Sequence, residues 1–290
     1  MTVMFNRVAI IGVGLIGGSM ARAMKKHGLC REIVGYTRRE TDVKKAVSLG
    51  VIDSYESTVQ AAVKNADLVI IAVPMGAFES MFRQMLGGLN PDTIITDVGS
   101  AKTSVIEMAA QVFSELPPGL VPAHPIAGTE KSGVEASFDS LFENRCTIVT
   151  PTEKSSGHAL RAVTELWQAI GAEVVQMTPE HHDTVLAATS HLPHVLAFSL
   201  VDTLSQLQEH SEIFRFAAGG FRDFTRIASS DPTMWRDICL HNKDAILGVL
   251  KQYEQQIKQL EAAIAEQDGI EIEKIFTRAK SARDNHVIGG

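Results

Sequence analysis

Two stretches of the sequence place side chains that can move a proton next to glycines that open a loop. They are 97–102 (DVGSAK) and 123–130 (AHPIAGTE). Each directly follows a short apolar run that we expect to be a strand, and α/β folds bind ligands at such strand ends. A histidine there is often only structural, but a neutral imidazole can also take the proton of a substrate hydroxyl while hydride leaves the same carbon. We therefore predict a proton-transfer site at His124, beside the loop that carries Ser100.

The dinucleotide that would accept the hydride is predicted by a glycine-rich turn. Residues 12–17 (GVGLIG) follow an apolar strand and open a helix, the context in which this motif binds a dinucleotide. Gly12 allows the tight turn, Gly14 lets the backbone approach a pyrophosphate, and Gly17 lets helix and strand pack closely. The helix N-terminus adds free N–H groups that favour an anion. The predicted cofactor residues here are Gly12, Gly14, Leu15, Ile16 and Gly17, with Val73 and Pro74 at a later strand end.

The choice between NAD and NADP is predicted from the end of the expected strand 33–36. An NAD site carries an Asp or Glu there, about 20 residues beyond the turn, which binds the ribose 2′-hydroxyl. This sequence has Thr37, followed by Arg38 and Arg39. A hydroxyl and two guanidinium groups suit a 2′-phosphate, so we expect NADP preference or use of both cofactors. If the two arginines only form a solvated face, the site accepts either cofactor.

The order of the elements predicts the fold class. The first 177 residues alternate strand and helix patterns, which is typical of a doubly wound parallel sheet. At 178–180 (TPE) a helix starts, and no convincing strand follows. We predict an α/β fold with a Rossmann-type dinucleotide-binding domain at 1–178 and an all-α domain for substrate binding and dimerisation at 179–290. The expected strands are 7–11, 33–36, 68–73, 93–97, 120–123, 147–150 and 173–177.

Two patterns indicate how the helices of the second domain pack. The run 182–208 is apolar on several faces, which predicts a helix buried from more than one side. Pro193 predicts a kink or break near 190–194. A later helix carries an apolar seam that favours helix pairing, within the domain or across a homodimer. The seam residues are Ile246, Leu250, Tyr253, Ile257, Leu260 and Ile264.

Composition and charge exclude several classes of protein. The net charge of −7 disfavours nucleic acid and anionic membranes as partners, because those surfaces attract clustered Lys and Arg. The uninterrupted apolar runs are too short to span a membrane, and no signal-peptide pattern begins the chain. The three cysteines are far apart, which fits reduced thiols. We therefore expect a cytoplasmic protein that acts on a small molecule.

The chain resembles the prephenate and arogenate dehydrogenases of tyrosine biosynthesis in five motifs. In order, these are GVGLIGGS, DVGSAK, HPIAGTEKSGVE, SHLPHVLAF and FRDFTRIASSDPTMWRDI, and the resemblance covers Val8 to about Gln267. It implies oxidative decarboxylation of prephenate, arogenate or both, to 4-hydroxyphenylpyruvate or tyrosine, with hydride transfer to NAD or NADP. Such hydride transfer needs no metal ion, so we predict none. The sequence leaves the choice between the two substrates open.

The resemblance also implies roles for the residues that match its motifs. His124 would draw the proton from the ring hydroxyl of the substrate, and Ser100 would hydrogen-bond both that hydroxyl and His124. Arg226 would hold the ring carboxylate through its guanidinium group. His194 would contact the substrate side chain. The remaining predicted substrate residues are Ser190 and His191 behind His194, and Thr129 and Glu130 at the pocket entrance or a subunit contact.

Two alternative functions follow from the same glycine turn. One is a β-hydroxyacid or imine reductase, but such enzymes usually rely on a lysine in the first long helix of the second domain, and 178–208 contains none. The other is a non-catalytic dinucleotide sensor that controls a partner. A sensor acting on DNA would need a basic face or a DNA-binding helix pair, and the sequence has neither pattern.

Overall fold

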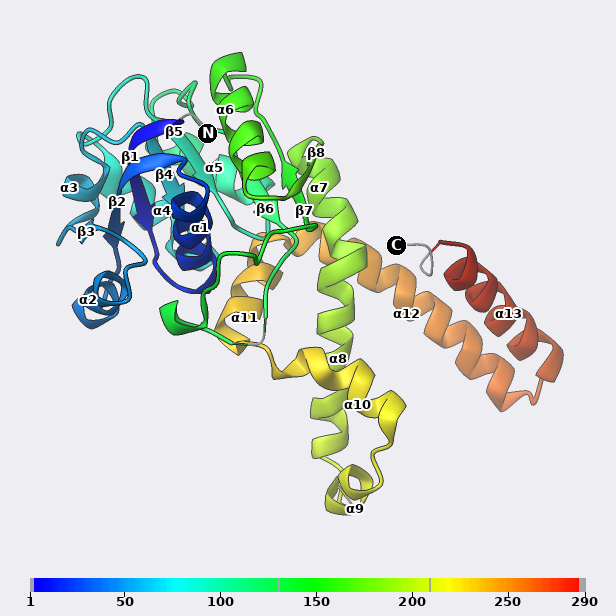
Figure 1. Ribbon diagram of the computed structural model, residues 1–290. Coiled ribbons are helices and arrows are strands. Elements are labelled where there is room, and N and C mark those ends of the chain that lie inside the picture. The colour runs from blue at the N-terminus through cyan, green and yellow to red at the C-terminus, as the bar shows by residue number, and fades with distance from the viewer. Residues whose placement is uncertain (1–2, 130, 209, 287–290) are drawn as a thin grey trace. The chain divides into compact units, whose positions relative to one another are not determined.

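The computed structural model describes residues 3–129, 131–208 and 210–286 (Figure 1). It divides into two compact units, Met1–Lys243 and Asp244–Gly290. The predicted fold class is confirmed, because a parallel five-stranded sheet with flanking helices precedes a helical part.

The first sheet is parallel throughout and has the strand order β3-β2-β1-β4-β5. The chain moves outward from β1 first in one direction and then in the other, so the order reverses between β1 and β4. In doubly wound folds, ligands bind outside the carboxyl ends of the strands at such a point. The strands are β1 (Phe5–Ile11), β2 (Cys30–Tyr36), β3 (Ser54–Tyr55), β4 (Leu68–Ile71) and β5 (Ile94–Asp97). The helices between and after them are α1 (Leu15–Lys26), α2 (Glu40–Ser48), α3 (Val59–Val63), η1 (Met75–Ala77), α4 (Phe78–Met85) and α5 (Thr103–Val112).

Each face of this sheet has its own apolar core. Successive residues of a strand point to opposite faces. In β1, Val8 and Ile10 therefore pack into a cluster that includes α1, while Ala9 and Ile11 pack into a second cluster with α4 and α5. Full burial of a Val or Ile side chain contributes about 1.5–3 kcal/mol to the free energy of unfolding. Burial on both faces explains why β1 and β4 are apolar at nearly every position.

The last three strands form a separate sheet, which differs from the single parallel sheet expected. They are β6 (Ala123–Pro125), β7 (Cys146–Val149) and β8 (Glu173–Gln176), with β6 antiparallel and β8 parallel to β7. The strand expected at 120–123 was placed too early. Leu120 forms only a single bridge to Ile95, and Pro122, which has no N–H group, interrupts the ladder there. Helix α6 (Gly157–Ala169) packs against β8, whereas the short η2 (Val134–Ala136), between β6 and β7 in the chain, packs against α1 and α2.

The long helix expected at 182–208 consists of three continuous parts (Figure 1). Helix α7 (Pro179–Leu186) begins at the predicted cap, since Thr178 accepts the His181 N–H at 3.2 Å. A π-helical turn, η3 (Ala187–His191), joins α7 to α8 (Leu192–Ser205). The wider π turn accommodates Pro193, which lacks an N–H group, so the chain bulges where a kink or break was expected.

The prediction that this helix is buried from several sides was wrong. In α8, Ala197 is the one buried residue. In the most apolar 18-residue stretch of Pro179–Ser205, 22% is buried. By length and composition alone this stretch could cross a membrane, with a mean hydropathy of 1.4. The sequence analysis considered only uninterrupted apolar runs. It did not identify this stretch, because His and Ser interrupt the run although they add no charge. The apolar side chains of α8 other than Ala197 are therefore only half-buried in the single chain.

The helices after α8 complete the first unit and form the second. In the first unit they are α9 (His210–Arg215), α10 (Gly219–Thr225), η4 (Arg226–Ser229) and α11 (Pro232–His241). The sequence at 230–232 (SDP) begins α11, because Asp231 accepts the N–H groups of Thr233 and Met234 at 2.7 and 2.9 Å. Next come α12 (Lys243–Ala265) and α13 (Gly269–His286). Three residues of the predicted seam on α12, Tyr253, Ile257 and Ile264, are exposed.

Candidate active site

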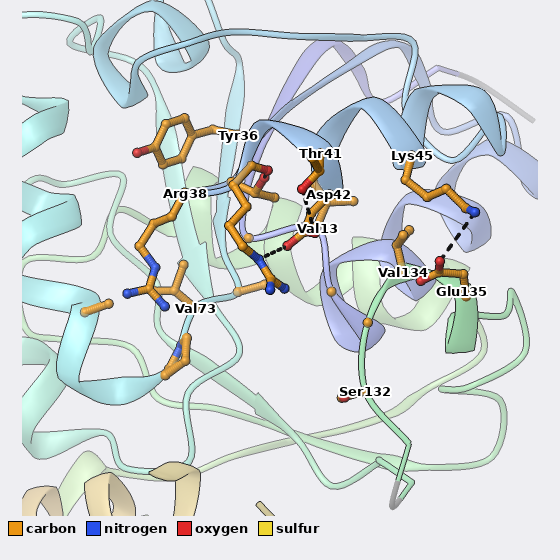
Figure 2. Close-up of a pocket in the computed structure, with 18 of the residues that line it drawn as sticks. Val13, Tyr36, Arg38, Thr41, Asp42, Lys45, Val73, Ser132, Val134 and Glu135 are labelled. Atoms are coloured by element: carbon orange, nitrogen blue, oxygen red, sulfur yellow. Dashed lines mark hydrogen bonds and ion pairs between the residues drawn. The ribbon is translucent and has the colours of Figure 1, made fainter.

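A cavity of about 970 Å³ lies at the carboxyl ends of β1, β2 and β4 (Figure 2). Its volume is in the range of small-molecule and cofactor sites. The loop that contains Ser132, Gly133, Val134 and Glu135 contributes another part of its wall. The predicted cofactor residues that line it are Gly12, Gly14, Thr37, Arg38, Arg39, Val73 and Pro74. The other three, Leu15, Ile16 and Gly17, form the first turn of α1 and do not line the cavity.

The glycines of the turn fit a dinucleotide in different ways. Gly12 has a φ of +100°, and a Cβ atom on it would lie 2.3 Å from the carbonyl oxygen of Ala72. A Cβ atom on Gly17 would lie 2.1 Å from the carbonyl oxygen of Gly12. Gly14 instead faces open space, with no atom within 4 Å, and caps α1 without a side-chain hydrogen bond. Gly12 and Gly17 therefore close the turn, and Gly14 leaves room for a pyrophosphate at the helix N-terminus.

The cavity has cations at the end of β2, where an NAD site would have a carboxylate. Figure 2 shows Arg38 near Val73, and Lys45 beside Glu135. Arg39 pairs with Asp42 at 2.8 Å, and Lys45 pairs with Glu135 at 3.5 Å. The Thr37 hydroxyl donates to the carbonyl of Arg39 at 2.7 Å. Because these ion pairs are exposed, each contributes little and an anionic ligand can replace the carboxylate.

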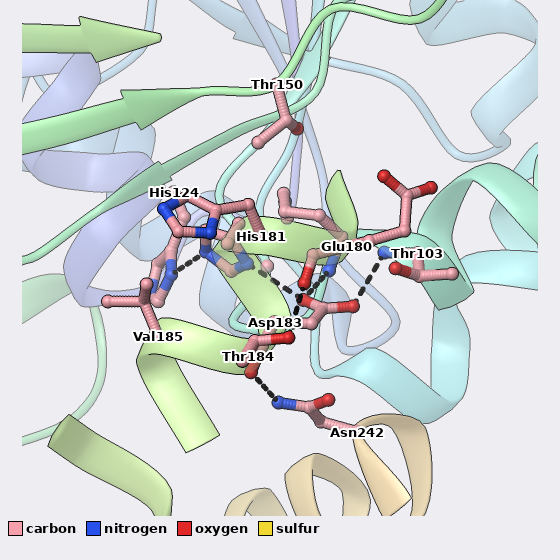
Figure 3. A network of polar contacts seen from close by, with 12 residues as sticks. Thr103, His124, Thr150, Glu180, His181, Asp183, Thr184, Val185 and Asn242 are labelled. Atoms are coloured by element: carbon pink, nitrogen blue, oxygen red, sulfur yellow. Dashed lines mark hydrogen bonds and ion pairs between the residues drawn. The ribbon is translucent and has the colours of Figure 1, made fainter. Parts of the chain in front are cut away.

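His124 is held from behind by two residues of α7 (Figure 3). Its Nδ1 atom lies 2.8 Å from Nε2 of His182, and the Nδ1 atom of His182 lies 2.8 Å from Oδ1 of Asp183. Asp183 also accepts the backbone N–H groups of Lys102 and Thr103 at 2.8 and 2.9 Å, at the start of α5. His182 is completely buried, whereas His124 is partly exposed. The Nδ1 atom of His124 is thus held by a hydrogen bond to His182, whereas its Nε2 atom has no hydrogen-bond partner among the described residues.

A buried ion pair positions the backbone next to His124. Lys102 and Asp97 are both inaccessible to solvent, and the Lys102 ammonium contacts Oδ2 of Asp97. That ammonium also donates to the carbonyl of Ala123 at 2.7 Å, and Oδ1 of Asp97 accepts the N–H of Ala123 at 3.2 Å. The pair therefore binds both backbone groups of the residue before His124, which links the loop after β5 to β6.

The surroundings keep the histidines neutral and Asp183 ionised. Burial, His182 and the charge of Lys102 hold the pKa of His124 well below its ordinary value. Burial also lowers the pKa of His182. Burial would raise the pKa of Asp183, but hydrogen bonds from His182 and from the N–H groups of Lys102 and Thr103 bring it below its usual range. At neutral pH, His124 is therefore an unprotonated base.

A second group of predicted residues gathers between α8, η4 and α11. His194 stacks on Trp235 with ring centroids 3.6 Å apart, and its Nδ1 atom donates to the carbonyl of Ser190 at 2.9 Å. Burial and the positive charge of Arg226 lower the pKa of His194. His191 is buried, and its Nδ1 atom accepts a hydrogen bond from Asn242 at 3.0 Å.

The remaining predicted site residues lie in loops. Ser100 is partly exposed in the loop after β5, and its hydroxyl makes no hydrogen bond with His124 in the described part of the chain. Thr129 is exposed and accepts the N–H of Lys131 at 3.2 Å. Glu130 lies outside the described residues.

Sequence reasoning missed the residues that support His124. Lys102 was part of a motif but had no predicted role, and His182 was not among the predicted site residues. Their signal was weak: a lysine five residues after an aspartate at a strand end, and a His-Asp pair in the first turns of a capped helix. Trp235, which lies in a matched motif but had no predicted role, stacks on His194. No local pattern indicated that these segments meet.

A glycine turn that opens into a cofactor-sized cavity, with a neutral strand-end histidine in the same unit, defines a dinucleotide-dependent dehydrogenase. The family follows from comparison with known proteins. Residues 20–176 match the nucleotide-binding domain of prephenate dehydrogenase, and residues 178–278 match its dimerization domain. The chain therefore belongs to the prephenate dehydrogenase family.

Similar proteins support this membership over nearly the whole chain. A cyclohexadienyl dehydrogenase of Zymomonas mobilis is 41% identical over 96% of this chain and 95% of its own length. A prephenate dehydrogenase of Bacillus subtilis is 40% identical over 98% of this chain and 77% of its own length. The crystal structure of prephenate dehydrogenase from A. aeolicus, in complex with hydroxyphenyl propionate and NAD+, is 36% identical, with a TM-score of 0.90 and coverage of 98% and 99% of the two chains.

The predicted resemblance and enzyme class are thereby confirmed. The chain is a prephenate/cyclohexadienyl dehydrogenase, an enzyme of tyrosine biosynthesis that oxidatively decarboxylates its substrate with a nicotinamide dinucleotide. The reductase and sensor alternatives are set aside.

Proposed function

We propose that His124 is the general base of the reaction and that its Nε2 atom takes the proton of the ring hydroxyl. The observation that carries this proposal is that Nδ1 of His124 is bound to His182 at 2.8 Å while Nε2 remains available. The nicotinamide ring, when bound, accepts the hydride from the same ring carbon. The bond from the ring to its carboxylate breaks, carbon dioxide leaves, and the electron pair of that bond makes the ring aromatic. The ring oxygen then takes a proton back, which the imidazolium of His124 supplies, and becomes the phenol hydroxyl.

We assign Ser100 to the ring hydroxyl, Arg226 to the ring carboxylate and His194 to the substrate side chain. Support comes from the charge of Arg226 acting on His194 and from the stacking of His194 on Trp235, which orients the imidazole. Ser190 and His191 act behind these residues, through the carbonyl that binds His194 and through Asn242. Thr129 lines the pocket entrance or meets the partner subunit in this proposal, and the same role is kept for Glu130, which lies outside the described residues.

Steady-state kinetics with prephenate and arogenate, each with NAD and NADP, test this function and decide which substrate is preferred. The variant His124→Ala is expected to lose about 100- to 10,000-fold in kcat, the usual contribution of a general base. Its Kd for the dinucleotide should stay near that of the wild-type enzyme. An active His124→Ala enzyme would contradict the assignment.

We propose that the enzyme prefers NADP or uses both cofactors. Support comes from Thr37, Arg38, Arg39 and Lys45 around the end of β2, where no carboxylate follows the strand directly. The A. aeolicus relative was crystallised with NAD+, so a strict requirement for NAD is the competing outcome. The ratio of kcat/KM for NADP and NAD measures the preference.

We propose a homodimer through the helical region and a cytoplasmic location. Residues 178–278 match a dimerization domain, and the half-buried apolar side chains of α8 and the exposed ones of α12 are of the kind that a second copy would cover. Light scattering after size-exclusion chromatography should give twice the mass of the chain. Recovery of the enzyme in the membrane pellet after cell lysis would contradict the cytoplasmic location.

A further inference from the structure

Asp183, His182 and His124 are hydrogen-bonded in series, and each side chain fixes the protonation of the next. Starting from the interior, Asp183 contacts Nδ1 of His182, and Nε2 of His182 contacts Nδ1 of His124, both at 2.8 Å. His182 is fully buried and Asp183 is 5% exposed, so water does not compete for these hydrogen bonds. Asp183 at the buried end of the series therefore decides which ring nitrogens of His182 and His124 carry a proton.

Asp183 can only accept in this arrangement. Its Oδ1 atom accepts the N–H of Lys102, and its Oδ2 atom accepts the N–H of Thr103. With both oxygens bound to backbone donors, the carboxylate accepts the proton on Nδ1 of His182 as well. A neutral imidazole carries one proton, so Nε2 of His182 is left as an acceptor.

The charges that face His182 keep it neutral. The ammonium of Lys102 disfavours a second proton on the ring, while Asp183 and Asp97 act in the opposite sense. His124 on β6 and His191 on η3 are the other titratable neighbours, and both are neutral for the same reason of burial. The ring of His182 thus presents a bare Nε2 atom to His124.

We infer that His182 is a positioning residue that, with Asp183, holds His124 as the Nδ1–H tautomer, so that Nε2 of His124 is the atom that accepts the substrate proton. This inference rests on the proposed role of His124 as base. The same hydrogen bond stabilises the imidazolium that forms when His124 takes the proton, because Nδ1–H then donates to a neutral acceptor. Without His182, the ring of His124 can rotate and adopt the other tautomer.

The test compares two substitutions at His182 with the same change one residue earlier. His182→Leu removes the acceptor, His182→Gln retains an amide oxygen that can accept from Nδ1 of His124, and His181→Leu alters an exposed neighbour on the same helix. His182→Leu is expected to lower kcat about 100-fold while KM for both ligands changes little. His182→Gln should recover most of this loss, and His181→Leu should match the wild type.

Nitrogen-15 NMR of the histidine rings gives a readout that a purely structural role would not move. The signals of His124 are assigned by their absence in His124→Ala. Wild-type and His182→Gln enzymes should show Nδ1 protonated and Nε2 bare, whereas His182→Leu should show a mixture of tautomers. Melting temperatures and dinucleotide affinity identify a variant that fails to fold.

Two outcomes would overturn the inference. One is a His182→Leu enzyme whose kcat stays within about threefold of the wild type while His124→Ala is inactive, since the base would then need no support. The other is an unchanged Nδ1–H signal of His124 in folded His182→Leu. If His124→Ala itself remains active, the proposed base is wrong, and that result is separate from any result at His182.

Discussion

The dinucleotide cavity and the network behind His124 are both attached to the first sheet, but they are built in different ways. The part of the cavity that suits a pyrophosphate depends on the backbone of one contiguous turn, residues 12–17. The network takes side chains from four separate segments, at Asp97 and Lys102, His124, His182 and Asp183, and Asn242. A backbone site needs only a local conformation, whereas a side-chain network exists only after distant segments have packed.

The largest expected effect tests whether the network also stabilises the fold. Lys102→Met leaves the carboxylate of Asp97 buried without its partner, and breaking a buried ion pair in this way costs about 3–5 kcal/mol. Urea unfolding should show this loss, and Lys154→Met, at an exposed position, should change stability by less than about 0.5 kcal/mol. A loss below about 1 kcal/mol for Lys102→Met would mean that the pair is not a structural link.

The next effect concerns the pH dependence of stability. Burial lowers the pKa of His191 to about 4. An unfolded histidine has a pKa of about 6.5, so the unfolded chain takes up the proton first as the pH falls. Neutral His191 therefore contributes fully to the free energy of unfolding above about pH 6.5. As the pH falls from there towards 4, this contribution, about 3 kcal/mol in all, is lost.

His191→Gln should therefore flatten the fall in unfolding free energy between pH 6.5 and 4. The flattening should reach at most about 1.4 kcal/mol per pH unit, the limit for one proton. His158→Gln, which changes an exposed histidine, should leave the wild-type slope. Equal slopes in all three proteins would show that His191 does not couple to folding.

A matched pair of alanine substitutions separates the two tasks of the glycine turn. Gly12→Ala puts a Cβ atom 2.3 Å from the Ala72 carbonyl at a φ of +100°, so it should destabilise the fold by about 1–3 kcal/mol. Gly14→Ala meets open space and should leave the melting temperature nearly unchanged, while its methyl group occupies the place left for the pyrophosphate.

Calorimetry should then show that Gly14→Ala binds dinucleotide about tenfold or more weakly, which corresponds to about 1.4 kcal/mol. Equal loss of stability in the two variants would contradict the division of roles between Gly12 and Gly14.

The smallest effect concerns the cofactor. Thr37→Asp puts a carboxylate at the end of β2, where it would repel a 2′-phosphate and accept hydrogen bonds from a 2′-hydroxyl. The kcat/KM for NADP should fall about tenfold relative to that for NAD, since the position is open to solvent and charge effects there are screened. Thr41→Asp, on the same cavity wall but beyond the strand end, is the control for added charge alone. Similar ratios in both variants would mean that Thr37 does not select the cofactor.

The sequence predicted the first sheet well, because strands buried on both faces are apolar at nearly every position and are bounded by turns. It failed where local pattern and tertiary context disagreed. Pro122 delayed the start of β6, and the two-residue β3 is too short to have a pattern. The apolar run 182–208 predicted a buried helix, but the apolar side chains of α8 other than Ala197 are only half-buried in the single chain.

The sequence by itself determined the turn at 12–17, the helix caps at Thr178 and Asp231, and the candidate base His124, because each depends on a few adjacent residues. Only the tertiary structure decided that Lys102 and Asp97 hold the backbone beside His124, and that His182 and Asp183 lie behind its ring. A single sequence carries no sign that residues about 60 or 80 positions apart will meet. Their contact is set by the packing of α7 against β6 and the start of α5, and buried hydrogen bonds form only once that packing has excluded water.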